Sequence, residues 1–421
     1  MRRHRLVAPL TLVALAGCST RATPRRVEVT PASDRIVRVA LPSAGAQVSA
    51  TGDFSWFAGD GVTLMARARR GERWSVEMDS ARTRVRAKRP GGEPLGWQSG
   101  MIVRATGESF LTHGGKRYRG ELGFVARDTG LLAVNRVDIE AYLRGVVPLE
   151  MGARPRGDSS ALQAQAVASR SYATVRSLDG GGFYDVRGTT ADQVYGGVDA
   201  ENELANAAID ATRGLVLRYQ GRVVDAPFHS TCGGSTAEPA EVWRGPNGGP
   251  YLRRVSDRVS DGVAGSDRFY CDIAPRYRWT RALSATQLNA ALEQYLKSYA
   301  AVPGGRPGAA RAVGVGSRTA SGRVAVLDVE TERGMFTVRG NDIRYVMRAP
   351  GGEILPSTYF SVEPEYRDGA LAGVMLRGQG YGHGVGMCQW GAIGRARAGQ
   401  SFRAILGTYY PGTTVGSVSN P

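Results

Sequence analysis

Short runs in which apolar and polar residues alternate occupy the chain from residue 35 to about residue 137 and predict β-strands. The clearest of these runs span 36–41, 74–78 and 83–86. Glycine pairs between the runs, as at 91–92 and 114–115, are typical of turns. We therefore expect a β-rich N-terminal part over residues 35–134.

Helical spacing of apolar residues begins after this part. Asp138 is a candidate N-cap for a short helix over 139–143, which we expect Gly145 to end before an apolar stretch that leads to Glu150. A longer helix is predicted over 160–178, where alanines recur on one face and allow close packing. Other helices are predicted over 201–212, 284–301 and 340–347, and strands over 215–219, 223–229, 324–330 and 335–339. This mixed order predicts an α+β fold without regular βαβ units.

A glycine stands at every second position from Gly378 to Gly386. If this segment is extended, Gln379, Tyr381 and His383 share one face and the other face carries only hydrogen atoms. Such a bare face allows another backbone or a ligand to approach closely. The spacing is as consistent with tight core packing as with ligand binding.

The first 18 residues resemble a bacterial lipoprotein signal. A basic leader precedes an apolar run too short to span a bilayer, and the run closes with Leu-Ala-Gly-Cys18, which is similar to a lipobox. The resemblance implies lipidation of Cys18, a tether over 19–34, and a protein anchored by its lipid in the outer membrane, facing the periplasm of a Gram-negative bacterium. An ordinary cleaved signal peptide is the alternative.

Composition narrows the classes of function. With 421 residues, of which 42% are hydrophobic, the chain is large enough for two or three domains with a real core. The net charge of +16 comes mostly from arginine and is typical of a solvated surface, although a basic surface also attracts anionic polymers and membranes. The export signal and the lack of a recognisable binding motif argue against nucleic acid as a partner.

Few residues qualify as catalysts on sequence grounds. Beyond Cys18 the cysteines are Cys232, Cys271 and Cys388, and a disulfide between Cys232 and Cys271 stays open. His383 with Cys388, or His229 with Cys232, could act as a catalytic pair or as metal ligands, but neither spacing is specific. Glu150 follows an apolar run, which raises the proton affinity of a carboxyl and suits a general acid.

Four motifs together resemble the SpoIID/LytB family. They cover residues 134–151, with Val-Pro-Leu-Glu150-Met, residues 161–173, with Ala-Gln-Ala-Val-Ala-Ser-Arg170, residues 228–234, with Phe-His229-Ser-Thr-Cys, and residues 380–392, with Gly-His383-Gly-Val-Gly-Met. The resemblance extends over about residues 35–415 and implies a catalytic core over 135–415. It also implies an action on bacterial peptidoglycan.

For this chain the resemblance implies a lytic transglycosylase in which Glu150 is both the acid and the base. Protonated Glu150 would protonate the MurNAc–GlcNAc glycosidic oxygen, and the carboxylate would then deprotonate the C6 hydroxyl, so that a 1,6-anhydro ring closes. The expected glycan-binding residues are Arg170, Tyr172, His229, Tyr381, His383 and Gln389, with Arg144, Tyr195 and Trp390 as further candidates. A second carboxylate from Asp185, Glu203, Glu238 or Glu241 would permit hydrolysis instead.

Some members of the family bind zinc in the segment that corresponds to 185–195. Arg187, Ala191 and Asp192 stand there in this chain, so we expect neither that metal site nor any other cofactor, while zinc at the remaining histidines and cysteines stays open. Two other functions remain as alternatives. One is a non-catalytic peptidoglycan-binding module that enhances an N-acetylmuramoyl-L-alanine amidase, and the other is a lipoprotein that only ties envelope layers together.

Overall fold

The computed structural model describes residues 35–42, 46–178, 182–245, 248–259 and 268–418. The predicted signal peptide, the lipidation site Cys18 and the tether over 19–34 therefore lie outside the described residues. None of the helices within the ranges given above is both long enough and apolar enough to cross a bilayer.

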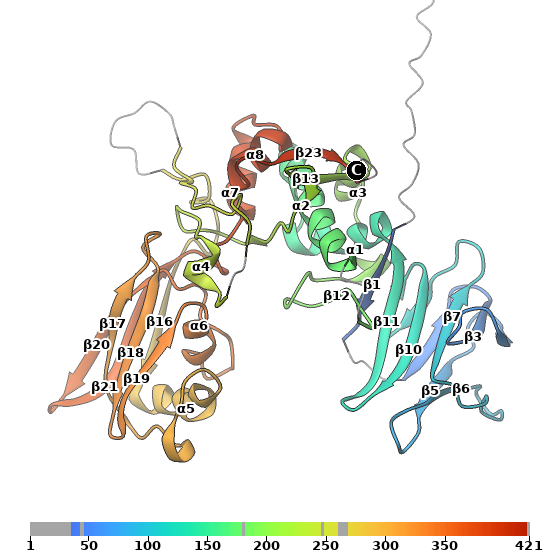
Figure 1. The fold of residues 1–421 in the computed structure, drawn as a ribbon, viewed down its shortest axis with the longest axis horizontal. Helices are drawn as coiled ribbons and strands as arrows, with labels where there is room; N and C mark the ends of the chain where they lie inside the picture. Colours follow the sequence, from blue (N-terminus) through green and yellow to red (C-terminus); the bar gives the residue numbers. More distant parts are fainter. Residues whose placement is uncertain (1–34, 43–45, 179–181, 246–247, 260–267, 419–421) are drawn as a thin grey trace, which may run out of the picture. The chain divides into compact units, whose positions relative to one another are not determined.

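Two packed sheets form the N-terminal part (Figure 1). The first has the order β12-β1-β11-β10-β7-β3-β4 and consists of β12 (Val186–Arg187), β1 (Ile36–Ala40), β11 (Gly130–Asp138), β10 (Glu121–Arg127), β7 (Gly100–Ala105), β3 (Phe54–Ala58) and β4 (Leu64–Ala68). The second has the order β6-β5-β2-β8-β9 and consists of β6 (Val85–Lys88), β5 (Trp74–Met78), β2 (Gln47–Ala50), β8 (Leu111–His113) and β9 (Lys116–Tyr118). Trp56 of the first sheet and Trp74 of the second are buried with ring centroids 5.9 Å apart, so the sheets bury their apolar faces against each other.

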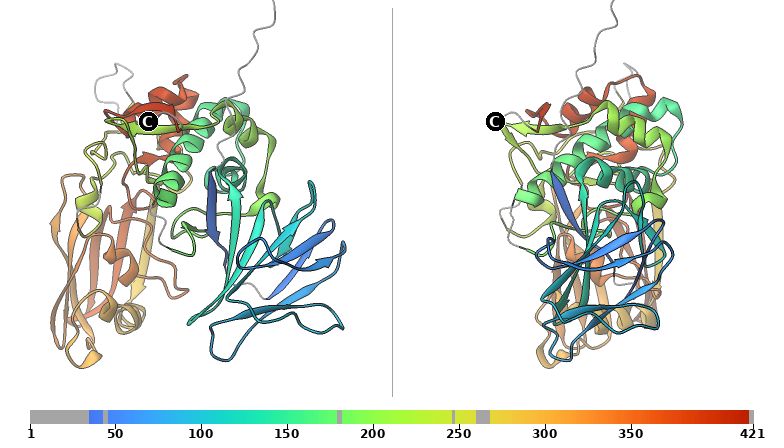
Figure 2. Two further views of the ribbon diagram at one scale, coloured as in Figure 1. Left: turned by 45° about the vertical axis from the view of Figure 1, so that its right-hand side comes forward. Right: turned by 90° about the vertical axis from the view of Figure 1, so that its right-hand side faces the viewer.

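Helix α2 (Ser159–Leu178) is central to the helical part, where it contacts α1 (Ile139–Met151), α3 (Glu203–Ala211), α7 (Gln389–Arg397) and α8 (Phe402–Tyr409). Figures 1 and 2 show the C-terminal helices, coloured red, beside the green α2. Ala161, Ala164 and Ala168 are fully buried, so the small face predicted from the sequence is the face that packs. Short elements complete this part: the 3-10 helices Arg156–Asp158 and Gly197–Ala200, α4 (Pro239–Val242), β13 (Leu215–Tyr219), β14 (Arg222–Val223), β15 (Phe228–His229), β22 (Met387–Cys388) and β23 (Thr414–Ser417).

A second hydrophobic cluster lies between residues 279 and 376. It is built on the sheet β16-β21-β20, with β16 (Arg278–Ser284), β21 (Ala370–Gln379) and β20 (Phe360–Arg367), and on the sheet β17-β18-β19, with β17 (Ala310–Arg318), β18 (Val324–Thr331) and β19 (Gly334–Arg339). Helices α5 (Ala285–Tyr295) and α6 (Asp342–Val346) and the 3-10 helices Leu296–Ser298 and Pro303–Gly305 belong to the same stretch. Arg278 pairs with Gln379 across β16 and β21, so this stretch leaves and rejoins the rest of the chain at one place. The first hydrophobic cluster, in contrast, includes residues on both sides of the expected boundary at 134.

The α+β class is confirmed, and most predicted elements are present. The predicted helix over 139–143 was too short, because α1 continues to Met151 through Gly145 and Pro148. Gly145 does not end the helix. It allows close packing instead, since a Cβ there would lie 2.5 Å from the ring of Tyr195. The strand predicted over 223–229 was also too long, because only β14 and β15 are extended.

The glycine ladder from Gly378 to Gly386 is not extended as a whole. Strand β21 ends at Gln379, and Gly380, Gly382, Gly384 and Gly386 then all adopt positive φ, between 71° and 112°. This conformation favours glycine at each of these four positions. The predicted close approach is present, because a Cβ on Gly386 would lie 2.0 Å from the carbonyl oxygen of Pro227.

Candidate functional site

Glu150 lies in the last turn of α1, partly buried, with both carboxylate oxygens bound by donors from other elements. Its Oε1 accepts a hydrogen bond of 2.8 Å from the backbone N–H of Val194, which belongs to the loop after β12. Its Oε2 accepts one of 3.3 Å from Nε2 of Gln389, the first residue of α7. Two segments far apart in the sequence therefore meet at this carboxyl.

Burial raises the pKa of Glu150 above its ordinary value of 4.5, because desolvation disfavours the charged form. The hydrogen bonds from Val194 and Gln389 oppose this effect, since both donors stabilise the carboxylate. The site thus favours a retained proton and also holds the carboxylate once the proton has left. Both properties are needed in one group that acts first as an acid and then as a base.

Polar residues of α2 and of the loop before Val194 support this arrangement. Nε2 of Gln389 lies 3.4 Å from Oε1 of the buried Gln165, and Gln165 in turn donates to Ser169 across 3.0 Å. Next to Val194, Gln193 accepts a hydrogen bond of 2.8 Å from the hydroxyl of Tyr142 in α1. These buried bonds fix the loop and the amide that contact Glu150.

His229 and His383 bind the backbone in place of the carboxyl of Glu150. Nε2 of His383 lies 2.8 Å from the carbonyl oxygen of Phe228, and its Nδ1 accepts from the N–H of Val385. Nδ1 of His229 lies 3.2 Å from the carbonyl oxygen of Val385. Burial lowers the pKa of His229 to about 3 and that of His383 well below its ordinary value, so both imidazoles are neutral. The two histidines therefore connect the glycine ladder to β15. We had expected them to face the glycan instead.

The aromatic candidates divide into two groups. Tyr195 is buried and donates to Asn135 across 2.7 Å, while Tyr172 is partly buried and donates to Asp192 across 2.6 Å. Tyr381 and Trp390 are partly exposed, and each has an arginine over its ring. Trp390 follows Gln389 directly, and the guanidinium of Arg154 lies 4.8 Å from the centre of its ring. Trp390 is thus the aromatic candidate that is adjacent in sequence to a hydrogen-bond donor of Glu150.

The two arginines expected to bind the glycan are engaged elsewhere. Arg170 is fully buried and forms a two-pronged ion pair with Glu140, with N–O distances of 2.9 and 2.7 Å. It therefore belongs to the core, because a fully buried guanidinium does not reach a ligand at the surface. Arg144 pairs with Asp210 at 2.7 Å. The sequence motif could not distinguish an arginine that faces a ligand from one that joins α1 to α2.

The other carboxylates considered for a second catalytic role form no hydrogen bond, in the described part of the chain, with the two residues that donate hydrogen bonds to Glu150. Asp185 pairs with Arg38 at 2.6 Å, Glu241 binds Ser321, and Glu203 and Glu238 are exposed at the starts of α3 and α4. Within the ranges that the structure describes, no hydrogen bond joins any of the four to Val194 or Gln389.

Segment 185–195, in which we expected no zinc site, contains a hydrogen bond to Asp192. The backbone N–H of Arg187 donates to Asp192 across 2.9 Å, and Ala191 is exposed. The sulfur atoms of Cys232 and Cys271 lie 3.4 Å apart but are not joined, so the two residues are neighbours and not a disulfide.

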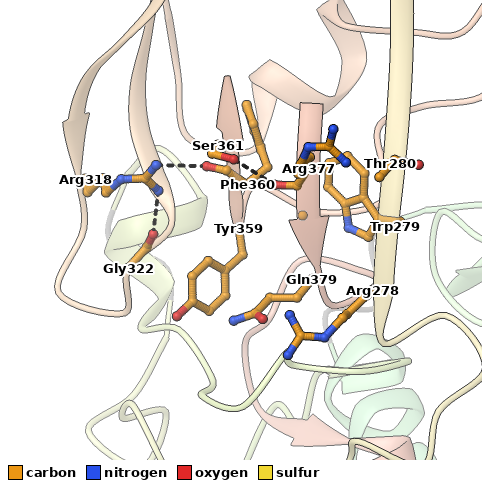
Figure 3. A pocket seen from close by; sticks show the side chains of 11 residues that line it. Arg278, Trp279, Thr280, Arg318, Gly322, Tyr359, Phe360, Ser361, Arg377 and Gln379 are labelled. Atoms are coloured by element: carbon orange, nitrogen blue, oxygen red, sulfur yellow. Dashed lines mark hydrogen bonds between the residues drawn. The ribbon is translucent and has the colours of Figure 1, made fainter. Parts of the chain in front are cut away.

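A cavity of about 710 Å³ lies on the sheet β16-β21-β20 (Figure 3). Figure 3 shows Arg278, Tyr359 and Gln379 close together along one wall, while Arg318 is held by carbonyl oxygens of Gly322 and Phe360. The residues that line this cavity do not include Glu150 or either of its hydrogen-bond donors. It is therefore separate from the carboxyl site.

Sequence reasoning identified Glu150 and Gln389 but missed Val194, Gln165 and Arg154. A backbone N–H such as that of Val194 leaves no signal in side-chain identity. Gln165 stands in the motif over 161–173, and its polarity on the otherwise small, apolar face of α2 is the sequence signal for its role.

Similarity to known proteins identifies the family of this chain. A family model described as "Stage II sporulation protein" matches residues 127–219, and one described as a domain of unknown function matches residues 237–386. The chain is 33% identical over 316 residues to an uncharacterized protein of Brachyspira hyodysenteriae, an alignment that covers 75% of this chain and 76% of that protein. It is 28% identical over 302 residues to stage II sporulation protein D of Bacillus subtilis, covering 67% and 76%. It is also 31% identical over 306 residues to the amidase enhancer of Bacillus subtilis, covering 65% of this chain but only 40% of that protein. The chain belongs to the SpoIID family.

Proposed function

We propose that this protein is a lytic transglycosylase that cleaves MurNAc–GlcNAc bonds in peptide-stripped peptidoglycan strands. The observation that carries the proposal is the environment of Glu150, a desolvated carboxyl with a raised pKa that two donors also bind as a carboxylate. The likeness to stage II sporulation protein D supports a role at the cell wall.

In the proposed reaction, protonated Glu150 donates its proton to the glycosidic oxygen as the bond to C1 of MurNAc breaks. The resulting carboxylate is held by Val194 and Gln389 and accepts the proton of the C6 hydroxyl, whose oxygen then bonds to C1. The 1,6-anhydro ring closes and Glu150 is protonated again. No water is consumed, and the internal nucleophile has a high effective concentration.

The surroundings of Glu150 favour this lyase reaction over hydrolysis. A hydrolase uses two carboxylates on opposite sides of the sugar. Asp192, two residues before Val194, has both of its oxygens occupied, by the hydroxyl of Tyr172 and by the N–H of Arg187. Among the described residues, we therefore assign both proton transfers to Glu150.

We further propose that Arg154 and Trp390 bind the muramic acid next to the cleaved bond. Amidase action leaves a free lactyl carboxylate on this sugar, and guanidinium groups bind carboxylates well. Arg154 lies 3.9 Å from its nearest carboxylate oxygen, in Asp158, and within the described part of the chain its Nε has no hydrogen-bond partner. The indole of Trp390 offers an apolar face to the sugar ring.

The test is to incubate the purified protein with amidase-stripped glycan strands and to analyse the products by mass spectrometry. We expect anhydro-MurNAc ends from the wild type and from Glu365→Gln, which changes an exposed carboxyl far from the site in sequence, and no turnover with Glu150→Gln. A thermal unfolding curve for each variant separates loss of catalysis from loss of fold. Equal products from Glu150→Gln and the wild type would refute the proposal.

A second function is favoured by the 31% identity to the amidase enhancer. In that case the protein leaves stripped glycan intact but accelerates an N-acetylmuramoyl-L-alanine amidase on whole peptidoglycan. The same Glu150→Gln variant distinguishes the two, because amidase stimulation would persist in it. Glycan that is retained without any turnover or stimulation would leave only an envelope-tethering role.

We also propose that the protein acts in the periplasm from a lipid anchor at Cys18. The basis is the lipobox-like sequence alone. Metabolic labelling with a fatty acid should mark the wild type and not Cys18→Ser, and membrane fractionation should place the labelled protein in the outer membrane. Labelling of Cys18→Ser would refute the anchor.

A further inference from the structure

Three cysteines and one aspartate meet in the core beside the glycine ladder. Cys232 follows β15, Cys388 ends β22, and Asp257 and Cys271 come from the segment between α4 and β16. All four are buried, and their three sulfurs and one carboxylate oxygen lie within 4.8 Å of one another. The proposed cleavage of glycan uses none of these groups.

The separations are close to those of a tetrahedral metal site. Zinc bonds of about 2.3 Å to sulfur and about 2.0 Å to oxygen place ligand atoms roughly 3.5–3.8 Å apart. Here the sulfurs of Cys232 and Cys271 are 3.4 Å apart, and the sulfur of Cys232 is 3.7 Å from Oδ2 of Asp257. A shift of less than about 1 Å would bring all four atoms to one ion.

The carboxylate and one thiol already have the supporting contacts that metal ligands require. Oδ1 of Asp257 accepts hydrogen bonds from the hydroxyl of Tyr409, at 2.7 Å, and from Nη2 of Arg395, at 3.1 Å, so Oδ2 is the oxygen that faces the thiols. The sulfur of Cys388 accepts hydrogen bonds of 3.2 Å from the backbone N–H groups of Cys232 and Gly391. Such second contacts orient ligands around a bound metal.

The charges around the cluster also favour a bound metal ion. Arg395 is buried against Asp257, and the almost fully buried Arg323 donates to the carbonyl oxygen of Cys232 across 2.8 Å. Nε and Nη1 of Arg323 have no hydrogen-bond partner among the described residues. Three thiolates and one carboxylate around a divalent cation carry two net negative charges, and these balance the two buried guanidinium groups.

We propose that Cys232, Asp257, Cys271 and Cys388 bind one divalent metal ion, with Zn²⁺ as the ion that this donor set fits best. Thiolate-rich tetrahedral sites select zinc among abundant divalent ions, and four protein ligands leave no open position for catalysis. The ion would be structural and, because all four ligands are buried, would enter as the chain folds. Since Cys388 is the N-cap of α7, the ion would also fix Gln389 against Glu150. This site departs from the expectation of no cofactor and does not rest on the proposed cleavage of glycan.

The first experiment measures metal in the protein purified under reducing conditions and supplied with Zn²⁺. We expect about one zinc per chain by elemental analysis. Replacement by Co²⁺ should give the intense visible bands of tetrahedral cobalt together with thiolate-to-cobalt charge-transfer absorption. A zinc content no higher than that of the protein-free buffer, with no cobalt spectrum, would overturn the proposal.

Variants identify the ligands. Cys388→Ser and Asp257→Asn should each lose at least most of the bound zinc, whereas the matched control His229→Gln, which changes a buried imidazole near Cys388, should keep it. Loss of zinc from His229→Gln would overturn the ligand assignment. If a variant fails to fold, the cobalt spectrum of the wild type still decides the question. Peptide mapping gives the competing outcome: a complete Cys232–Cys271 disulfide in protein isolated from cells would overturn the metal site.

Discussion

Replacing Arg170 with methionine should severely destabilise the protein, because it leaves the charge of Glu140 buried and nearly unpaired. Arg170 is 0% and Glu140 2% exposed, and two hydrogen bonds of 2.9 and 2.7 Å join them. Arg170 also donates to the carbonyl oxygen of Leu215 across 2.9 Å. After the substitution, Glu140 keeps only the backbone N–H of Gly214 as a donor from outside α1 among the described residues, at 3.0 Å. Breaking a buried ion pair on one side costs about 3–5 kcal/mol, which is a large part of the roughly 5–15 kcal/mol that stabilises a typical domain.

The assay is urea unfolding followed by circular dichroism, on Arg170→Met, Glu140→Leu and the double variant. We expect the double variant to recover most of the lost stability, because no uncompensated charge remains in the core. Arg144→Met is the matched control. Its pair with Asp210 is partly exposed, so the loss should be below about 1 kcal/mol.

One result would refute this reasoning. If Arg170→Met unfolds within about 1 kcal/mol of the wild type while binding of stripped glycan is lost, the guanidinium acts on the ligand, as the sequence motif alone had suggested. Equal losses in Arg170→Met and Arg144→Met would also contradict a special role for burial.

Three further predictions follow from the site and the ladder. Because burial raises the pKa of Glu150, the stability linked to its proton is complete below about pH 4.5 and is lost as pH rises through the folded-state pKa. In urea unfolding, Glu150→Gln should therefore gain stability relative to the wild type as pH rises above about 4.5, and a difference that stays constant with pH would contradict this. Gln389→Leu removes a hydrogen-bond donor that lowers the pKa of Glu150. If Glu150 is the acid of the proposed glycan cleavage, the alkaline limb of its pH–rate profile should move to higher pH, and an unmoved limb would show that Gln389 does not act on this acid. Gly386→Ala should lower the free energy of unfolding by more than about 2 kcal/mol, because φ is 71° and the new Cβ would lie 2.0 Å from the carbonyl oxygen of Pro227. The control Gly399→Ala, with φ of 81° and no atom of the described residues within 4 Å of the new Cβ, should lower it by about 1 kcal/mol. Equal denaturation midpoints for the two variants would exclude the steric effect.

The sequence predicted those features that local pattern determines. Alternating runs predicted the strands of the N-terminal sheets, and the alanine face predicted α2. The helix predicted from residue 284 is α5, whose start carries a capping box of Ser284 and Gln287 that the prediction had not included. The local signal failed where tertiary contacts decide. A glycine such as Gly145 is typical of a helix end. Here, however, the absence of a side chain lets the ring of Tyr195 pack against the helix, and α1 continues past Gly145.

The candidate site was predicted in part for the same reason. Glu150 and Gln389 stand in recognisable motifs, and the structure joins them by a hydrogen bond. The position of Arg170 depends on Glu140, which belongs to another helix, and the support from Val194 comes from a backbone group. Neither property is encoded in the identity of one residue. The meeting of the three cysteines likewise depends on how segments far apart in sequence are brought together.

The register of β16 and β21 has a consequence for the order of folding. Phe228 pairs with Met387 although the two residues are far apart in the sequence, and direct closure of so long a loop is slow and entropically costly. Arg278 and Gln379, however, face each other across the two strands, so the roughly 100 residues between them can fold on their own core and bring residues 277 and 380 together. The effective loop that β15 and β22 must close is then much shorter. We therefore expect the stretch from β16 to β21 to form before β15 pairs with β22, next to Glu150's partner Gln389.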